Sequence, residues 1–476
     1  MPQKQTILSV GIDLGTSTTS FVVSRLSMDN TASYFSVPRV DITDKEIVYK
    51  SAVHETPLID SWRIDGAGVR RLLEEEYRRA GLRAADVATG AVIITGETAR
   101  KENAAEVLAQ LSSLAGEFVV STAGPDLEAI IAGKGSGAWQ YSIDQATTVA
   151  NLDIGGGTTN IALFRSGETL AKGCVDIGGR QVRVDREGRV TYMSESAAKI
   201  ARARAVDVSV GQCPAPAALA RLCGEMAYLL EQLTRGEHTA LLDEVTTAGS
   251  SRFAPPTLPR AVFFSGGVAD GIYEAPADMF AYGDIGLLLG DEIKKSGFFR
   301  DYRVLRGSET IRATVVGAGS YTTTLSGSTI FYSEDVFPLK NVPVLRLTPQ
   351  EQERCFEGES GHLEAKLRWF SGETDDGRVV LAIRGVKSPS YRQLTLLAQS
   401  IAGAAGALPP GAPLLLSVES DMAKALGGAV FRDIGGARPV VSIDTVQLDD
   451  GDYIDLGRPL MDGLVIPVVV KTLIFG

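Results

Sequence analysis

Cysteine and histidine are scarce in this sequence of 476 residues. The four cysteines, Cys174, Cys213, Cys223 and Cys355, form no CxxC pair. Their sparse spacing argues against a disulfide framework and is typical of a protein that stays in a reducing compartment. The three histidines lie far apart along the chain, which argues against a zinc site.

Long apolar runs are also missing. The longest one near the C-terminus, residues 464–475, is interrupted by Pro467 and Lys471 and is too short for a membrane helix. The apolar run at residues 7–10 is too short for the core of a signal peptide. The sequence therefore predicts a cytoplasmic protein without a membrane partner.

The sequence has no excess of basic residues. It contains 47 lysines and arginines and 58 acidic residues, which gives a net charge of −11. This balance argues against a primarily nucleic-acid-binding protein. No G-x-x-x-x-G-K-[ST] phosphate loop occurs. The glycine-rich residues 133–137 fit neither that spacing nor G-x-G-x-x-G, and we interpret them as a surface turn.

Two stretches that are present repeat each other 140 residues apart. Residues 12–19 read IDLGTSTT and residues 152–159 read LDIGGGTT, each followed by a second apolar run. Each predicts a β-hairpin with an aspartate, Asp13 or Asp153, at the end of its first strand. A turn of glycines and threonines exposes backbone amides that favour an anion, and a carboxylate suits a hydrated Mg²⁺. Two such hairpins facing each other could hold a polyphosphate from both sides.

A third element follows at residues 261–267, where an apolar strand enters the turn Ser265-Gly266-Gly267. Its order after the two hairpins resembles the actin/Hsp70/sugar-kinase superfamily of ATPases. Residues 91–133 resemble the segment that leads into the first connector between the halves of that fold, and residues 311–319 resemble the second connector. The resemblance covers about residues 7–325. It implies two similar α/β halves around a nucleotide cleft.

A more specific similarity spans nearly the full length. It rests on SVGIDLGT at residues 9–16, IITGETA at 93–99, AGPDLE at 123–128, SGGV at 265–268, LSGSTI at 325–330 and GDYIDLG at 451–457. These segments resemble the EutA family of ethanolamine ammonia-lyase-reactivating proteins. Residues 190–255 and 340–375 carry little of the similarity.

This resemblance implies a chaperone-like ATPase that acts on ethanolamine ammonia-lyase, an adenosylcobalamin-dependent radical enzyme. With ATP and Mg²⁺, the factor would release damaged cobalamin from the lyase and let intact coenzyme enter. The family also implies association with a bacterial microcompartment, while self-association stays open.

The expected roles follow from the superfamily pattern. Asp13 and Asp153 would hold hydrated Mg²⁺, and Gly266 and Gly267 would face the adenosine. For the residue that orients the attacking water, Glu97, Asp126 and Glu128 are the candidates. A helix N-terminal role fits Asp126 better than this one, and it also fits Glu97. The residues expected to contact phosphate are Gly15, Thr16, Ser17, Thr18, Gly155, Gly156, Gly157 and Thr158.

The chain is long enough for two to four domains. We expect a first ATPase half at residues 1–145, a second half with the adenosine site at 146–335, and a smaller C-terminal α/β region at 336–476. Within the last, alternating apolar runs predict a βαβαβ unit over residues 379–443. Glu419 and Asp421, at a strand end there, suit either a partner-binding module or a domain that only packs.

The elements predicted elsewhere include helices at residues 68–79, 96–111, 127–132, 225–233, 284–295 and 313–324, and strands at 91–95, 118–120 and 261–264.

Three other functions stay open. A small-molecule kinase of the same superfamily would need an acceptor and would release a phosphorylated product. An actin-like scaffold would bind nucleotide without turnover. A dehydratase-activating ATPase would need a cluster of cysteines, for which the spacing gives no pattern.

Overall fold

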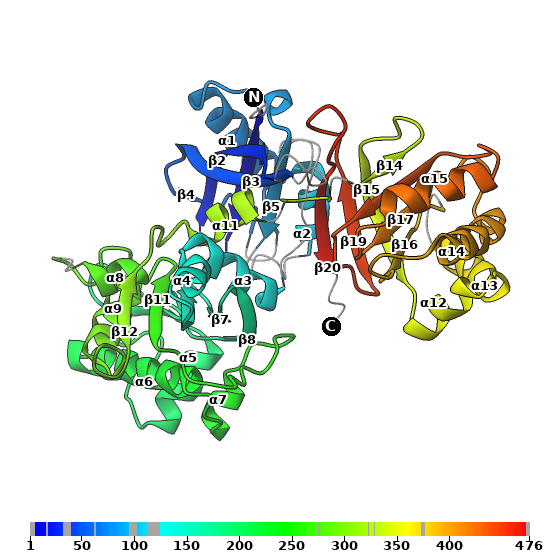
Figure 1. The fold of residues 1–476 in the computed structure, drawn as a ribbon. Coiled ribbons are helices and arrows are strands. Elements are labelled where there is room, and N and C mark those ends of the chain that lie inside the picture. Colours follow the sequence, from blue (N-terminus) through cyan, green and yellow to red (C-terminus); the bar gives the residue numbers. More distant parts are fainter. Residues whose placement is uncertain are drawn as a thin grey trace.

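The computed structural model describes residues 5–15, 18–31, 40–60, 63–94, 102–111, 124–274, 277–321, 323–327, 329–372 and 377–472. It contains three α/β regions, coloured blue, cyan to green, and yellow to red along the chain (Figure 1). Across these described residues, no helix is long and apolar enough to span a membrane.

The first sheet has the strand order β3-β2-β1-β5, with β4 paired to β2. Strands β1 and β2 form the first predicted hairpin, and β5 runs parallel to β1. Helix α1 buries Val69, Leu73 and Tyr77 against this sheet, and the Asp65 side chain caps its first turn. The elements are β1 (Gln5–Leu14), β2 (Thr18–Asn30), β3 (Val40–Lys50), β4 (His54–Glu55), α1 (Gly66–Arg79), β5 (Thr89–Ile94) and α2 (Ala104–Leu111), with a 3₁₀ turn at Ala84–Asp86.

The second sheet, ordered β12-β11-β6-β7-β8, repeats this plan. Asp153 of β6 lies opposite Asn160 of β7, as Asp13 of β1 lies opposite Ser20 of β2. A parallel strand, β11, again flanks the aspartate strand. The strands are β6 (Thr148–Ile154), β7 (Thr159–Arg165), β8 (Glu168–Val175), β11 (Ala261–Ser265) and β12 (Arg303–Arg306), beside a ribbon of β9 (Val182–Val184) and β10 (Val190–Met193). The helices are α5 (Glu195–Ala203), α6 (Pro216–Thr234), α7 (Ala240–Glu244), α8 (Ala269–Tyr273), α9 (Gly286–Lys295) and α10 (Phe298–Asp301).

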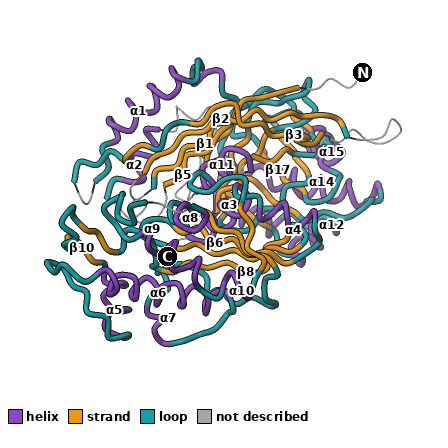
Figure 2. Tube along the Cα trace, turned by 90° about the vertical axis from the view of Figure 1, so that its left-hand side faces the viewer, coloured by secondary structure: helices purple, strands orange, loops and turns teal. Residues whose placement is uncertain are grey.

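Helices α3 (Pro125–Gly135) and α11 (Ala313–Tyr321) lie between the first and second sheets, with α4 (Ala138–Asp144) beside them (Figure 2). Glycines allow the two helices to touch through their backbones. A Cβ added at Gly135 would lie 1.8 Å from the Ala313 carbonyl oxygen, and one at Gly317 would lie 2.1 Å from the Ile131 carbonyl oxygen. The two helices are therefore a tightly packed joint that both halves share.

The third sheet is mixed, in the order β13-β20-β19-β15-β16-β17-β18-β14. Strands β15 to β18 are parallel, which confirms the predicted βαβαβ unit. Val469 of β20 packs with Ala91 and Ile93 of the first sheet, so this region contacts the first half. The elements are β13 (Thr323–Leu325), β14 (Phe331–Tyr332), β15 (Leu339–Arg346), α12 (Pro349–Phe356), α13 (Gly361–Gly372), β16 (Val380–Ile383), α14 (Tyr391–Ala404), a 3₁₀ turn (Ala405–Ala407), β17 (Leu414–Val418), α15 (Ala423–Asp433), β18 (Val440–Asp444), β19 (Asp452–Leu456) and β20 (Pro467–Thr472).

The predicted fold class is confirmed: two similar α/β halves of the actin-like type flank a shared pocket, and a further α/β region follows. The helix predicted at 313–324 is wrong at its end, because Thr323 and Thr324 pair with β20 in the third sheet. The helix predicted at 225–233 is part of the longer α6, which begins at a proline, Pro216. The strand predicted at 118–120 and the start of the helix predicted at 96–111 lie outside the described residues. The three domain limits stay predictions.

Candidate functional site

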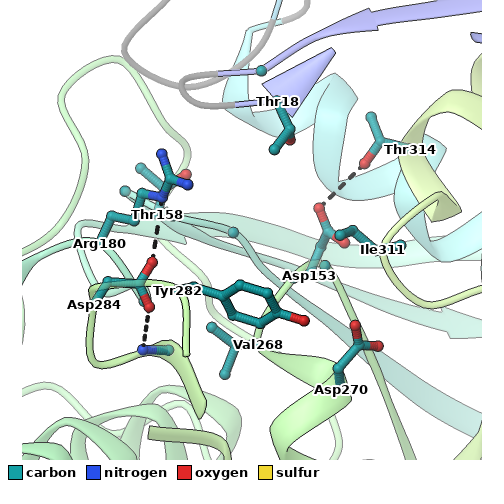
Figure 3. Close-up of a pocket in the computed structure, with 18 of the residues that line it drawn as sticks. Thr18, Asp153, Thr158, Arg180, Val268, Asp270, Tyr282, Asp284, Ile311 and Thr314 are labelled. Atoms are coloured by element: carbon teal, nitrogen blue, oxygen red, sulfur yellow. Dashed lines mark hydrogen bonds and ion pairs between the residues drawn. The ribbon is translucent and has the colours of Figure 1, made fainter. Parts of the chain in front are cut away.

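A pocket of about 470 Å³ lies between the first and second sheets. Both aspartate hairpins line it, although they are 140 residues apart in sequence. Asp13, Gly15 and Thr18 come from the β1–β2 hairpin, and Asp153 with residues 155–158 comes from the β6–β7 hairpin. Figure 3 shows Thr18 and Thr158 on facing walls of this space.

The two turns close in the same way. The amide of Gly15 donates to the carbonyl oxygen of Thr18 at 2.8 Å, and the amide of Gly155 donates to that of Thr158 at 2.9 Å. Two of the predicted phosphate contacts, Thr16 and Ser17, lie outside the described residues. The two hairpins are thus matched in register and in turn geometry as well as in sequence.

Asp153 is held in one orientation by two hydroxyl groups. Ser265 donates to its Oδ1 at 2.6 Å, and Thr314 of α11 donates to its Oδ2 at 3.2 Å. The Asp153 side chain is buried, and this burial raises the pKa of its carboxyl group while the two hydrogen bonds oppose the rise. The carboxylate is therefore fixed in place and stays poorly solvated.

Two glycines of the second hairpin, Gly155 and Gly156, could carry a side chain without a steric clash with the protein. A Cβ added at Gly155 or Gly156 would meet the nearest protein atoms at 3.7 and 3.5 Å, which is ordinary van der Waals contact. Neither residue has a positive φ. Packing and backbone conformation thus do not require glycine here, whereas close approach of a ligand to the backbone would.

Gly266 and Gly267 line the pocket as well, but for different physical reasons. Gly266 has a φ of +84°, and a Cβ there would lie 2.3 Å from the Ile154 carbonyl oxygen. The fold itself therefore demands glycine at 266. A Cβ at Gly267 would meet only Ile311 Cδ1, at 4.0 Å, so this position faces open space.

The candidate residues for orienting the attacking water do not all lie at the pocket. Glu128 of α3 lines the pocket, whereas Asp126 does not. The buried Asp126 carboxylate instead accepts a hydrogen bond from the Ser251 amide at 2.9 Å and lies 3.5 Å from the Lys172 ammonium. Glu97 lies outside the described residues. The structure thus brings Glu128 to the site and gives Asp126 a structural partner.

Several pocket residues were missed by the sequence reasoning. Arg180 follows Gly178 and Gly179 after β8, its amide donates to the Gly156 carbonyl oxygen at 2.7 Å, and its Nε donates to Asp284 at 3.3 Å. The adjacent glycine pair was the one signal for this loop. The other missed lining residues include Val53, Val268, Asp270, Tyr282, Leu287, Ile311 and Thr314.

Tyr282 projects into the pocket over Val268 (Figure 3). The Tyr282 side chain is 64% exposed, which is high for a large aromatic residue. Much of this residue is thus accessible to a ligand in the pocket.

The pocket is acidic. Among its described lining residues, five are acidic and Arg180 is basic; the acids are Asp13, Glu128, Asp153, Asp270 and Asp284. Burial raises the pKa of both Asp270 and Asp284, and the Arg180 charge opposes the rise at Asp284. A polyanion would be repelled here unless it carried a cation with it.

Comparison with known proteins shows which family the chain is similar to. The model of the family described as "Ethanolamine utilisation protein EutA" matches residues 5–476. Two relatives are named "Ethanolamine ammonia-lyase reactivase EutA". The one from Salmonella typhimurium is 36% identical over 470 residues, and the one from Escherichia coli K12 is 35% identical over 474 residues. Each alignment covers 98% of both chains. A solved Ppx/GppA family member from Aquifex aeolicus is 16% identical with a TM-score of 0.35, over 66% of this chain and 88% of that one.

Proposed function

Because the chain belongs to the family of the ethanolamine utilisation protein EutA, we propose that it is an ATP-dependent reactivating factor for ethanolamine ammonia-lyase. It would release damaged cobalamin from that adenosylcobalamin-dependent enzyme and let intact coenzyme enter. The observation that carries this proposal is the shared pocket of the two hairpins in a chain similar to the named reactivases from end to end. We place the protein in the cytoplasm; association with a microcompartment and self-association stay predictions.

The two hairpins would hold the phosphates of ATP. Glycines at 155 and 156 let the backbone approach a ligand, and the hydroxyl-bearing Thr18 and Thr158 face the pocket from both halves. The Arg180 guanidinium, anchored on Asp284, supplies a positive charge beside Gly156. A ligand held in this way contacts both halves, so ATP and ADP would favour different degrees of closure.

The donor set of the pocket fits Mg²⁺. Within the described residues, no group of three or more His, Cys, Asp and Glu side chains could hold a metal by itself. Mg²⁺ takes one or two carboxylates and keeps waters and phosphate oxygens as its other ligands, and Asp13 and Asp153 would provide those carboxylates. The ion would supply the positive charge that five acidic residues and a polyphosphate together require.

Glu128 is our candidate for orienting the water that attacks the terminal phosphate. Its side chain is buried at the first turn of α3 and lines the pocket. Phosphoryl transfer needs positioning more than covalent help from the protein, so one fixed carboxylate near the phosphate would suffice.

Tyr282 would stack on the adenine base, above Val268 and beside Gly267. We expect Tyr282→Ala to weaken ATP binding at least about fivefold, since stacking of a base on an aromatic ring contributes roughly 1–3 kcal/mol. Titration with a fluorescent ATP analogue would measure this change. Tyr391→Ala, at a tyrosine that is 81% exposed on α14, is the matched control and should leave the dissociation constant unchanged. Equal affinities of the two variants would remove Tyr282 from the adenine site.

The proposed function is tested by reactivation of a blocked lyase. The cognate ethanolamine ammonia-lyase is inactivated with cyanocobalamin and incubated with the protein, ATP, Mg²⁺ and adenosylcobalamin. We expect recovery of ammonia release that needs both ATP and Mg²⁺. Free phosphate without a phosphorylated small molecule would accompany it. No recovery, with ATP hydrolysis intact, would contradict the reactivating role, and a phosphorylated acceptor would indicate a kinase.

A further inference from the structure

The chain crosses from the second half to the first through a short link, residues 307–312, which joins β12 to α11. Strand β12 belongs to the second sheet. Helix α11 packs on the first sheet, where its residues Val315 and Val316 form an apolar cluster with Val22 of β2. The link is thus one of the places where a change in the angle between the halves would be taken up.

On one side, the link is fastened to the second half. The Gly266 amide donates to the Thr310 carbonyl oxygen at 3.0 Å, and the Thr310 hydroxyl donates to Asp270 at 3.3 Å. Ile311 lines the nucleotide pocket next to Gly267. We call Gly266, Gly267 and Asp270 the adenosine wall, and the link is bonded directly to it.

On the other side, two charged side chains fasten the link to the first half. Glu309 forms an ion pair with Lys50 at the end of β3, and Arg312 Nη2 donates to the Ser51 carbonyl oxygen at 2.8 Å. The Glu309 side chain is only 12% exposed. The Arg312 Nε atom is buried and has no hydrogen-bond partner among the described residues. Loss of either contact would leave a poorly solvated charge on the link, so both contacts are costly to break.

The residues that the link holds lead directly to the first aspartate hairpin. Ser51 is bonded twice to Phe21 of β2: its amide donates to the Phe21 carbonyl oxygen at 2.9 Å, and its hydroxyl accepts from the Phe21 amide at 3.0 Å. Five residues later, the Thr56 hydroxyl donates to the Gly15 carbonyl oxygen at 2.9 Å, and β4 pairs with Thr18. The link therefore connects the adenosine wall of one half to the phosphate turn of the other.

The glycine-rich residues 133–137 also hold the link. Their interpretation from sequence as a surface turn is wrong, because the first three residues end α3 and only Ser136 and Gly137 form a turn. Ser136 is fully buried, and its carbonyl oxygen accepts a hydrogen bond from the Ser308 amide at 3.0 Å. This segment thus ties the link to the helix that both halves share.

The link borders two cavities. Ile311 lines the nucleotide pocket, whereas Ser308 and Glu309 line a second cavity of about 630 Å³. Lys45 of β3 and Lys134 of α3 line this second cavity as well. Because there is space on both sides, specific contacts hold the link in place more than close packing does.

We propose that Glu309 and Arg312 are positioning residues that hold the first phosphate turn at a fixed distance from the adenosine wall. This inference rests on the proposed function, because a nucleotide is the ligand that would span the two. Neither residue is among the described residues that line the nucleotide pocket, so each acts through the backbone that it holds. Phosphoryl transfer depends on exact placement of the reacting groups, and a pocket whose walls are out of register would lose both affinity and rate.

The first test compares a long ligand with a short one. ATP would contact both the adenosine wall and the phosphate turn, whereas adenosine would contact the adenosine wall alone. We expect Arg312→Ala to weaken ATP binding about tenfold, a typical loss for a hydrogen bond from a charged group, and to leave adenosine binding unchanged. Arg312→Lys keeps a charged donor near the Ser51 carbonyl and should recover most of the ATP affinity. Calorimetric titration of the full chain with ATP and Mg²⁺, and with adenosine, measures both affinities.

The ion pair allows an exchange of charges. Glu309→Lys brings two ammonium groups together and should weaken ATP binding at least about fivefold, and Lys50→Glu should do the same. The double variant Lys50→Glu/Glu309→Lys restores an ion pair and should return to within about twofold of the wild type. Arg25→Glu is the matched control, since it breaks a 2.7 Å pair with Glu46 of β3 inside the first half. ATP binding by this control should be unchanged.

A distance between the halves gives a readout that needs no nucleotide. Cys213 is an exposed cysteine of the second half, and the other three cysteines are buried. Arg71 of α1, whose side chain is 71% exposed, provides a second labelling site in the first half as Arg71→Cys. Energy transfer between dyes at these two positions should show a different or broader distance in Glu309→Lys, and the double charge exchange should restore the original distance.

Three results would overturn the proposal. One is an equal loss of ATP and adenosine binding, which would mean that the substitutions damage the adenosine wall itself. The others are unchanged ATP binding in Arg312→Ala and a double charge exchange that binds ATP no better than the single variants. If the wild type bound no ATP, the proposed function would fail. A changed label distance in Glu309→Lys would then still show that this ion pair holds the halves, and an unchanged distance would overturn that as well.

Discussion

Asp153→Asn should lower the rate of ATP hydrolysis by about 10²-fold or more, which is the usual loss when one fixed electrostatic group of an active site is removed. The reason is that Asp153 is held by Ser265 and Thr314 at the wall that both hairpins share. An amide in its place keeps the shape and loses the charge that Mg²⁺ needs. Phosphate release at saturating ATP and limiting Mg²⁺ is the measurement.

The same substitution should not harm the fold. Burial raises the pKa of Asp153 above its unfolded value, so the folded state binds more protons, and stability falls as pH rises through this range. The asparagine variant should therefore equal or exceed the wild type in free energy of unfolding at pH 7, and the difference should vanish below the ordinary carboxyl pKa.

Asp444→Asn is the matched control for both measurements. Asp444 is likewise buried at a strand end, burial raises its pKa, and Thr329 donates to it, but it lies in the third sheet. ATP hydrolysis by this variant should equal that of the wild type. If Asp153→Asn kept full turnover at limiting Mg²⁺, Asp153 would have no role in holding the metal.

Gly266→Ala should destabilise the protein by about 2–5 kcal/mol, the sum of a left-handed backbone forced on alanine and of overpacking. The new Cβ would lie 2.3 Å from the Ile154 carbonyl oxygen at a φ of +84°. Urea unfolding followed by circular dichroism measures the loss.

Gly156→Ala provides the contrast in the neighbouring hairpin. Its Cβ meets Arg180 at an ordinary 3.5 Å, so the free energy of unfolding should change by less than about 1 kcal/mol. ATP binding should nevertheless weaken about tenfold, because the methyl group fills space next to the proposed phosphates. Loss of stability at 156, or tolerance at 266, would reverse our assignment of which glycine serves the fold and which serves the ligand.

The sequence was most informative where a signal was local. Each aspartate hairpin is one continuous stretch of the chain, and its repetition at 140 residues predicted both the two similar sheets and the pairing of Asp13 and Asp153 around one pocket. Helix α14 and strand β17 lie within the βαβαβ unit predicted over residues 379–443, where a strong apolar pattern and clear turns mark the elements.

The features that could not be predicted from the sequence depend on contacts between segments that are far apart along the chain. Arg180 meets Asp284 across 104 residues, and Thr314 meets Asp153 across 161. Lys45 of β3 and Lys134 of α3 line one cavity although they are far apart in sequence. Likewise, nothing local distinguishes Gly266, which the Ile154 carbonyl requires, from Gly267, which faces open space.

The most direct test of the central claim is a crystal structure of the protein with Mg²⁺ and a non-hydrolysable ATP analogue. We predict one nucleotide in the pocket, with its phosphates between Thr18 and Thr158, the metal beside Asp13 and Asp153, and the base against Tyr282. A nucleotide bound at any other place, or one that contacted a single hairpin and left the other empty, would contradict the account.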